Sequence, residues 1–238
     1  MKKINYLINT KSNFALIKSY LLNSFKIKFL KKKKKEFNAK HKMFLSDKKV
    51  TRDYFSLNAF DWINTLNEFK NKKFKFLEIG SFEGNSTLFI LENFKGVDLT
   101  CVDQWKQLYR EDGKREGYED LSINEIEKNF DTNLKDYSGR FLKKKISSNN
   151  FFRNNDQEFD VIYIDGSHYA PDVLEDCKNS WSVLKKNGIL ILDDYFWKGY
   201  AKIEENPAFA INQFLKEVNN KYEVANFSKY QLFLRKLN

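Results

Sequence analysis

Residues 76–86 read Phe-Leu-Glu-Ile-Gly-Ser-Phe-Glu-Gly-Asn-Ser, and this stretch decides the fold. The apolar run 74–79 predicts a buried strand, and 85–93 predict a helix. Two glycines, Gly80 and Gly84, therefore stand where a strand turns into a helix. Glycine permits positive φ and the close approach of a ligand, while free N–H groups at the helix start favour an anion. The spacing is neither the GxGxxG of dinucleotide enzymes nor the GK[ST] ending of a P-loop, so NAD and ATP phosphates are disfavoured.

Outward from this turn, predicted strands and helices alternate along the chain. The further strands are 98–102, 140–144, 159–164 and 189–192, and the further helices are 55–69, 121–134 and 172–184. Such alternation predicts a mostly parallel sheet covered by helices on both faces, the Rossmann-like, doubly wound α/β class.

The C-terminal end departs from this alternation. Pro207 opens a predicted helix through Lys216, and predicted strands 222–227 and 230–235 are joined by a short connection at 228–229. The sequence therefore predicts an antiparallel hairpin that closes the parallel sheet.

Positive charge is concentrated at the N-terminus. Lys and Arg number 42 against 32 Asp and Glu in 238 residues, but residues 1–50 alone hold 15 Lys and two acids, Glu36 and Asp47. The first fifty residues carry +13 and the rest −3, so the body of the chain is not a basic nucleic-acid-binding domain. We expect a basic, partly helical N-terminal extension over 1–50, with a solvated boundary from the lysine run 31–35 to residue 49, and one domain over 51–238.

Residues 14–30 contain a basic amphipathic helix by spacing, since Phe14, Ile17, Leu21 and Phe25 recur with a helical period. The first interpretation is a helix docked on its own domain or on a second subunit of a homo-oligomer. The alternative is contact with a membrane surface or with nucleic acid such as RNA. Lysines interrupt the segment too often for a spanning helix, and no signal-peptide cleavage site follows.

The only cysteines, Cys101 and Cys177, form neither a CxxC pair nor a cluster with histidine. Neither a disulfide framework nor a Cys/His zinc site is therefore expected, and a reducing, cytoplasmic location fits this usage.

Acidic residues follow three predicted strands. Asp103 ends the second strand, where an acid can accept both ribose hydroxyls of an adenosine, with Gln104 and Trp105 beside it. Asp165 and His168 follow strand 159–164, and Asp193 and Asp194 follow strand 189–192. Because adjacent strand ends lie about 5 Å apart, these carboxylates could converge and hold a hard divalent cation such as Mg²⁺.

The glycine turn and Asp103 together resemble the class I S-adenosylmethionine-dependent methyltransferases. The resemblance implies an α/β domain over about 51–238 that binds S-adenosylmethionine. The residues implied to hold the cofactor are Glu78, Gly80, Ser81, Phe82, Gly84, Ser86, Asp103, Gln104, Trp105, Ser148 and Asp165. Of these, Ser148 is implied to lie near the adenine.

The Ile-Asp-Gly-x-His segment at 164–168 and the Asp-Asp-Tyr segment at 193–195 resemble one branch of this family, which is related to metal-dependent sugar O-methyltransferases. That resemblance implies Asp165, Asp193 and Asp194 as metal ligands. Those relatives place an acidic general base just after the Ile-Asp-Gly, where this chain has Ser167 and His168. We therefore expect His168 to be the catalytic base, acting beside Asp165.

The predicted function is transfer of the sulfonium methyl to a hydroxyl of a small molecule or glycan, with divalent metal assistance. One alternative is an RNA or protein methyltransferase that uses the basic N-terminus, and another is a cofactor-binding scaffold without catalysis. The segment 104–117 is long and polar enough to act as a lid over the site. No code in the sequence identifies the acceptor.

Overall fold

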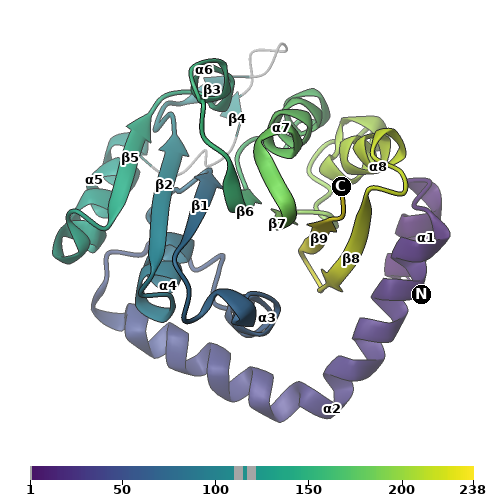
Figure 1. The fold of residues 1–238 in the computed structure, drawn as a ribbon, viewed down its shortest axis with the longest axis horizontal. Coiled ribbons are helices and arrows are strands. Elements are labelled where there is room, and N and C mark those ends of the chain that lie inside the picture. The colour runs from purple at the N-terminus through teal and green to yellow at the C-terminus, as the bar shows by residue number, and fades with distance from the viewer. Residues whose placement is uncertain (1, 110–114, 117–121) are drawn as a thin grey trace.

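The computed structural model describes residues 2–109, 115–116 and 122–238. Seven strands form one sheet in the order β5-β2-β1-β6-β7-β9-β8. The strands are β1 (Phe74–Ile79), β2 (Val97–Asp103), β5 (Phe141–Lys145), β6 (Phe159–Ile164), β7 (Leu184–Leu192), β8 (Tyr222–Phe227) and β9 (Leu232–Lys236). The first five of these pair in parallel, and β9 pairs antiparallel with both β7 and β8. The predicted α/β class with a closing antiparallel hairpin is confirmed (Figure 1).

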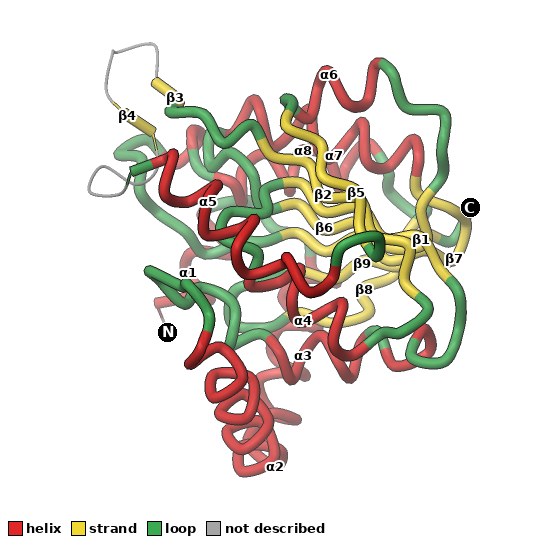
Figure 2. Tube along the Cα trace, turned by 90° about the vertical axis from the view of Figure 1, so that its left-hand side faces the viewer, coloured by secondary structure: helices red, strands yellow, loops and turns green. Residues whose placement is uncertain are grey.

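Helices cover both faces of the sheet. They are α1 (Lys2–Asn9), α2 (Phe14–Phe44), α3 (Ala59–Thr65), α4 (Asn85–Asn93), α5 (Ile123–Leu134), α6 (Ser148–Arg153), α7 (Ala170–Val183) and α8 (Pro207–Glu217). Figure 2 shows the strands as the middle layer, with α3 and α4 on one side and α6 and α7 on the other.

Two cores lie against the two faces because side chains alternate along each strand. In β7, Ile189 and Ile191 join the core under α3 and α4, whereas Leu190 and Leu192 join the core under α7 and α8. All four side chains are buried. The strands are nearly continuous runs of apolar residues because helices cover both faces of the sheet.

Several element boundaries differ from the prediction. The helix expected over 55–69 is divided into α3 and a 3₁₀ turn at Asn67–Phe69, and the short α6 was not predicted. The hairpin connection runs over 228–231: the N–H of Ser228 donates to the carbonyl of Gln231, and the N–H of Gln231 donates to the hydroxyl of Ser228. Strand β9 therefore begins at Leu232, two residues later than expected.

The N-terminal segment is more helical than the sequence suggested. The expected solvated boundary at 31–49 is helical as far as Phe44, since α2 continues through the lysine run. Lys34 forms an ion pair with Asp61 of α3, and Asn23 donates to the carbonyl of Phe227 at 2.8 Å. Figure 1 shows α2 along the outside of the molecule, past β8 and α3.

Residues of this segment also enter the two cores, since Leu7 and Leu16 are fully buried in one of them and Leu45 is buried in the other. No helix in the described part of the chain is both long enough and apolar enough to cross a bilayer.

Candidate active site

Four strand ends stand side by side at one edge of the sheet. The strands are matched so that Ile79 pairs with Val102 and Ile164, and Ile164 pairs with Leu192. Backbone hydrogen bonds continue one residue further: the N–H of Gly80 donates to Val102, that of Asp165 to Ile79, and that of Asp193 to Ile164. The glycine turn and three acid-bearing strand ends are therefore neighbours in space.

This edge is also where the order of strands reverses. From β1 the chain builds outward through β2 to β5, and it then returns to the other side of β1 with β6. In doubly wound sheets, ligands bind in the crevice outside the carboxyl ends of the strands at such a reversal. Gly80, after β1, and Asp165, after β6, flank that crevice.

The glycine turn requires its glycines. Gly80 has φ of +85°, and a Cβ placed there would lie 2.0 Å from the carbonyl oxygen of Asp165. Gly84 also has φ of +85° and is the N-cap residue of α4, and Phe82 between the two glycines has φ of +47°. A non-glycine residue held at positive φ is strained, and such strain is concentrated at functional sites.

Glu78 lies beneath the turn. Its buried carboxylate accepts hydrogen bonds from the hydroxyls of Ser81 at 2.8 Å, Ser86 at 2.5 Å and Thr87 at 2.5 Å. Burial raises the pKa of Glu78, and the three hydroxyl donors oppose that rise. Glu78, predicted to hold the cofactor, therefore stabilises the glycine turn and the start of α4 through these hydrogen bonds.

Asp103 holds the turn from the next strand. One carboxylate oxygen accepts the N–H groups of Ser81 at 2.9 Å and Phe82 at 3.0 Å, and the other accepts the N–H of Trp105 at 2.8 Å. Burial raises the pKa of Asp103, and the backbone donors lower it. Trp105 has φ of +40° and donates its indole N–H to the carbonyl of Phe82 at 2.9 Å.

A cleft of about 920 Å³ opens over these strand ends. It lies within the size range of small-molecule and cofactor sites. The predicted site residues that line it are Gly80, Ser81, Phe82, Ser86, Asp103, Gln104, Trp105, Ser148, Asp165, His168, Asp193 and Asp194, whereas Glu78 and Gly84 do not.

Asp165, His168 and Asp194 converge within the cleft. Each offers one ligand atom, and these atoms lie within 4.8 Å of one another. Nε2 of His168 is 2.7 Å from Oδ2 of Asp194, and the imidazole stacks on Trp197 at 4.7 Å between ring centroids. Asp194, two residues after the end of β7, has a left-handed backbone with φ of +55°. Its side chain therefore does not follow the alternation of the strand and points in a different direction from that of Asp193.

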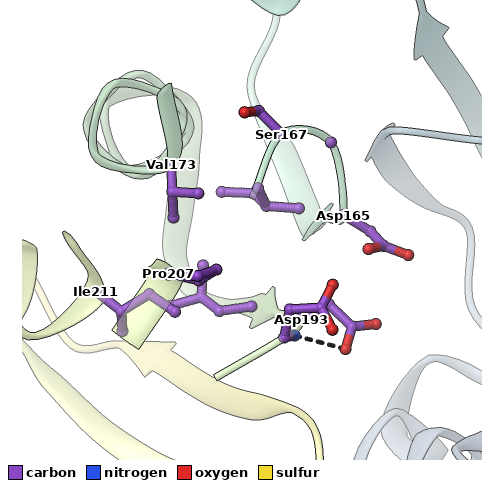
Figure 3. A pocket seen from close by; sticks show the side chains of 10 residues that line it. Asp165, Ser167, Val173, Asp193, Pro207 and Ile211 are labelled. Atoms are coloured by element: carbon purple, nitrogen blue, oxygen red, sulfur yellow. Dashed lines mark hydrogen bonds between the residues drawn. The ribbon is translucent and has the colours of Figure 1, made fainter. Parts of the chain in front are cut away.

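Asp193 is held in a different set of contacts from the one predicted. Its carboxylate accepts from the Tyr163 hydroxyl at 2.5 Å, from Nε2 of Gln231 at 2.6 Å and from the N–H of Asp194 at 2.7 Å. Figure 3 shows the carboxyl groups of Asp165 and Asp193 directed away from the apolar side chains of Val173 and Ile211. The group that the structure brings together is thus Asp165, His168 and Asp194, and Asp193 lies outside it; metal ligation by Asp193 stays a prediction.

The tyrosine links the two carboxyl groups. Its hydroxyl oxygen also lies 2.7 Å from Oδ2 of Asp165. A hydroxyl has one proton to donate, so contact with both groups favours a proton on one carboxyl. Burial first, and then the charges of Asp193 and Asp194, raise the pKa of Asp165.

The cluster fits a divalent cation by its chemistry. The carboxylates of Asp165 and Asp194 suit hard ions such as Mg²⁺ and Mn²⁺, with water completing the coordination and the imidazole of His168 beside them. A cation there would also offset the repulsion between Asp165 and Asp194 that raises the pKa of Asp165.

The sequence interpretation missed several residues at or behind the cleft. Tyr163 lines the cleft and reads as a strand residue, whereas Gln231 lies behind it in contact with Asp193 and reads as a hairpin residue. Neither has a local signal of a site. Asp176, within α7, is 4% exposed and lines the cleft, and burial raises its pKa to about 7. A carboxylate on the inner side of a predicted amphipathic helix is a signal that could have identified it.

Aromatic side chains also line the cleft. They are Tyr54, whose ring centroid lies 6.0 Å from that of Phe82, and Trp197, Tyr200 and Tyr230, together with Arg52. Of the predicted lid at 104–117, residues 110–114 and 117 lie outside the described residues. Its described part contains β3 (Leu108–Tyr109) and β4 (Arg115–Glu116), which pair antiparallel.

Comparisons with known proteins agree with this architecture. A family described as "Methyltransferase domain" matches residues 77–195, which run from β1 to the Asp-Asp-Tyr segment. An uncharacterized protein of Acanthamoeba polyphaga mimivirus is 25% identical over 140 residues, 56% of this chain and 56% of that protein. The chain thus aligns with little more than half the length of this relative.

Three solved structures share the fold. The MycE methyltransferase of the mycinamycin biosynthetic pathway, in complex with Mg and SAH, has a TM-score of 0.55 at 12% identity, covering 79% of this chain and 51% of that chain. A protein named as an rRNA methylase from Clostridium thermocellum has a TM-score of 0.55 at 14% identity, covering 79% and 100%. A protein named as an O-methyltransferase from Klebsiella pneumoniae has a TM-score of 0.52 at 13% identity, covering 93% of this chain and 98% of that chain.

Proposed function

The chain belongs to the methyltransferase domain family, and on that premise we propose that it transfers a methyl group from S-adenosylmethionine to a hydroxyl oxygen of a small molecule or sugar with divalent metal assistance. The observation that carries the proposal is the meeting of Asp165, His168 and Asp194 within 4.8 Å, directly beside the glycine turn. The methyl donor and the acceptor would thus meet at the carboxyl-terminal edge of the sheet.

The cofactor half of the cleft is assigned to the glycine turn and its supports. Ser81, Phe82 and Asp103 line it, and Asp103 fixes the backbone of the turn through two N–H groups. Ser148, at the start of α6, also lines the cleft and is assigned to the adenine side. A rigid turn lowers the entropy lost when the cofactor is aligned for transfer.

The acceptor half is assigned to the acid cluster and the aromatic walls. The acceptor oxygen attacks the sulfonium methyl in line, the carbon–sulfur bond breaks, and the hydroxyl proton passes to His168. Asp194, whose Oδ2 lies 2.7 Å from Nε2 of His168, orients the imidazole and stabilises the imidazolium that forms when His168 takes the proton. A divalent ion held by Asp165 and Asp194 would supply charge that lowers the pKa of the acceptor hydroxyl.

Two features favour a hydroxyl over a nucleobase amine as acceptor. Strand β6 is followed by Asp165-Gly166-Ser167-His168, which is not the Asn/Asp-Pro-Pro-aromatic run that grips an exocyclic amine. Tyr54, Tyr200 and Tyr230 offer flat apolar surfaces with polar edges, which suit a sugar ring or a small planar acceptor.

The test combines binding with transfer. Calorimetry with S-adenosylmethionine should show binding by the full chain and by Asp194→Asn alike. Transfer of a labelled methyl group to a panel of glycosides, phenols and total RNA should favour a hydroxyl acceptor, should require Mg²⁺ or Mn²⁺ after treatment with a chelator, and should be lost in Asp194→Asn. Metal-independent transfer, or transfer to RNA alone, would contradict the proposal.

A further inference from the structure

Helix α2 has an apolar face that the rest of the chain leaves uncovered. One side of the helix is covered, because Leu16 is fully buried and Ile17 and Tyr20 pack on the core. The other side carries a row of large apolar side chains that are 47% to 79% exposed, here named the outer stripe: Phe14, Leu21, Leu22, Phe25 and Phe29.

The outer stripe keeps to one side of the helix. Its members follow one another at intervals of seven, one, three and four residues, which keeps them within one side of a helix of 3.6 residues per turn. The rings of Phe25 and Phe29 contact each other, with centroids 5.0 Å apart. In both Figure 1 and Figure 2, α2 lies at the outside of the molecule, so nothing in the described residues covers this side.

The stripe is bordered by positive charge. Lys26 and Lys28 are exposed on its two borders, Lys18 is exposed within it between Phe14 and Leu21, and four of the five lysines at 31–35 are exposed just after it. The remaining one, Lys34, points to the opposite side, where it pairs with Asp61. Residues 1–50 contain no arginine, which is the residue that binds individual phosphates in a bidentate manner.

We propose that the outer stripe of α2 docks on an anionic lipid surface, with the helix lying in the plane of the headgroups. A helix with Phe and Leu on one side and lysines along its borders has the composition of such interfacial helices. The lysines would interact with anionic headgroups, while the aromatic side chains enter the boundary of the acyl chains.

Charge and side-chain chemistry favour lipid over two other occupants. A second copy docked by the same face would place the lysines of one helix beside those of its twofold partner. RNA would be held by the lysines alone and would leave a stripe of five apolar side chains without a role. A lipid surface uses both features.

Vesicle flotation of the full chain tests the inference. The protein should float with phosphatidylcholine vesicles that contain roughly one-third phosphatidylserine and stay at the bottom with phosphatidylcholine alone. The double variant Phe25→Ser/Phe29→Ser, which keeps every charge, should bind the anionic vesicles about tenfold more weakly or worse. The matched control is Leu142→Ser, which removes a 47% exposed apolar side chain from β5, far from α2 in sequence, and should float as the wild type does.

Further arms separate the other occupants. Replacing Lys31, Lys32, Lys33 and Lys35 by Gln should weaken flotation, and added salt should weaken it only in part because apolar contacts are not screened. Unaltered S-adenosylmethionine binding by each variant reports that the domain is folded. The inference is overturned if the double variant floats like the wild type. It is also overturned if the wild-type protein is a dimer and the double variant a monomer, or if the wild-type protein binds RNA but not vesicles.

Discussion

The indole N–H of Trp62 in α3 donates a hydrogen bond of 2.7 Å to Oε1 of Gln231, 169 residues later in the chain. Both side chains are fully buried. The amide nitrogen of the same glutamine donates to Asp193 at 2.6 Å, so a buried polar path runs from α3 to the acid side of the cleft. Gln231 is thus a positioning residue for a carboxylate at the site.

Replacing this glutamine should destabilise the protein. Gln231→Leu keeps a similar volume but leaves the Trp62 N–H and one contact of Asp193 without a partner. Because each unsatisfied buried group costs about 1 to 3 kcal/mol, we expect the free energy of unfolding to fall by about 2 to 4 kcal/mol in urea titrations.

The control is Gln213→Leu, at an exposed glutamine of α8, which should change the free energy of unfolding by less than about 0.5 kcal/mol. Equal urea midpoints for the two variants would show that the buried path contributes nothing to stability.

Asp103 should determine cofactor affinity. Asp103→Asn replaces a carboxylate that accepts three backbone N–H groups with an amide that has a single acceptor oxygen. Calorimetry should show S-adenosylmethionine binding weakened by about 10- to 100-fold. Asp98→Asn, an exposed acid on the same strand, should bind normally, and an Asp103→Asn protein of wild-type affinity would contradict the assignment.

His168 should act on turnover rather than on cofactor binding. His168→Gln removes the proton acceptor of the acid cluster, so kcat should fall roughly 10²-fold or more while the affinity for S-adenosylmethionine is retained. A variant that keeps the wild-type kcat would assign the proton to another group.

Asp176 should make stability depend on pH. Burial raises its pKa in the folded protein from 3.8 to about 7, so the folded state holds a proton that the unfolded chain releases earlier. Its contribution is therefore complete below about pH 4 and is lost as the pH rises through about 7, by at most about 4 kcal/mol.

Asp176→Asn should remove this dependence, so that its free energy of unfolding relative to the wild type rises between about pH 4 and about pH 7. Asp98→Asn, at an exposed acid of β2, should follow the wild-type curve. Parallel curves for the wild type and Asp176→Asn would mean that Asp176 is ionised in the folded protein.

The glycine turn and the strand ends could be predicted because their signals are local. An apolar strand followed by glycines that permit positive φ is visible within residues 74–84, and each acid that follows a strand is visible beside it. Parallel pairing then brings those acids to one edge, whatever the details of the helices.

The contacts of the acids could not be predicted in the same way. The direction of Asp194 depends on a left-handed backbone at φ of +55°, and that of Asp193 depends on Tyr163 and Gln231. No short sequence pattern encodes a hydrogen bond between residues 38 positions apart, as between Asp193 and Gln231.

The sequence by itself determined the layered α/β fold, the glycine turn and the edge of the sheet at which acids gather, because hydrophobic period and strand succession are properties of neighbouring residues. Only the tertiary structure decided that His168 joins Asp165 and Asp194 while Asp193 is held by Gln231, and that α2 turns one apolar side inward and the other outward. Those choices depend on which distant surfaces meet, and a helix with apolar residues on both sides does not specify which side is covered.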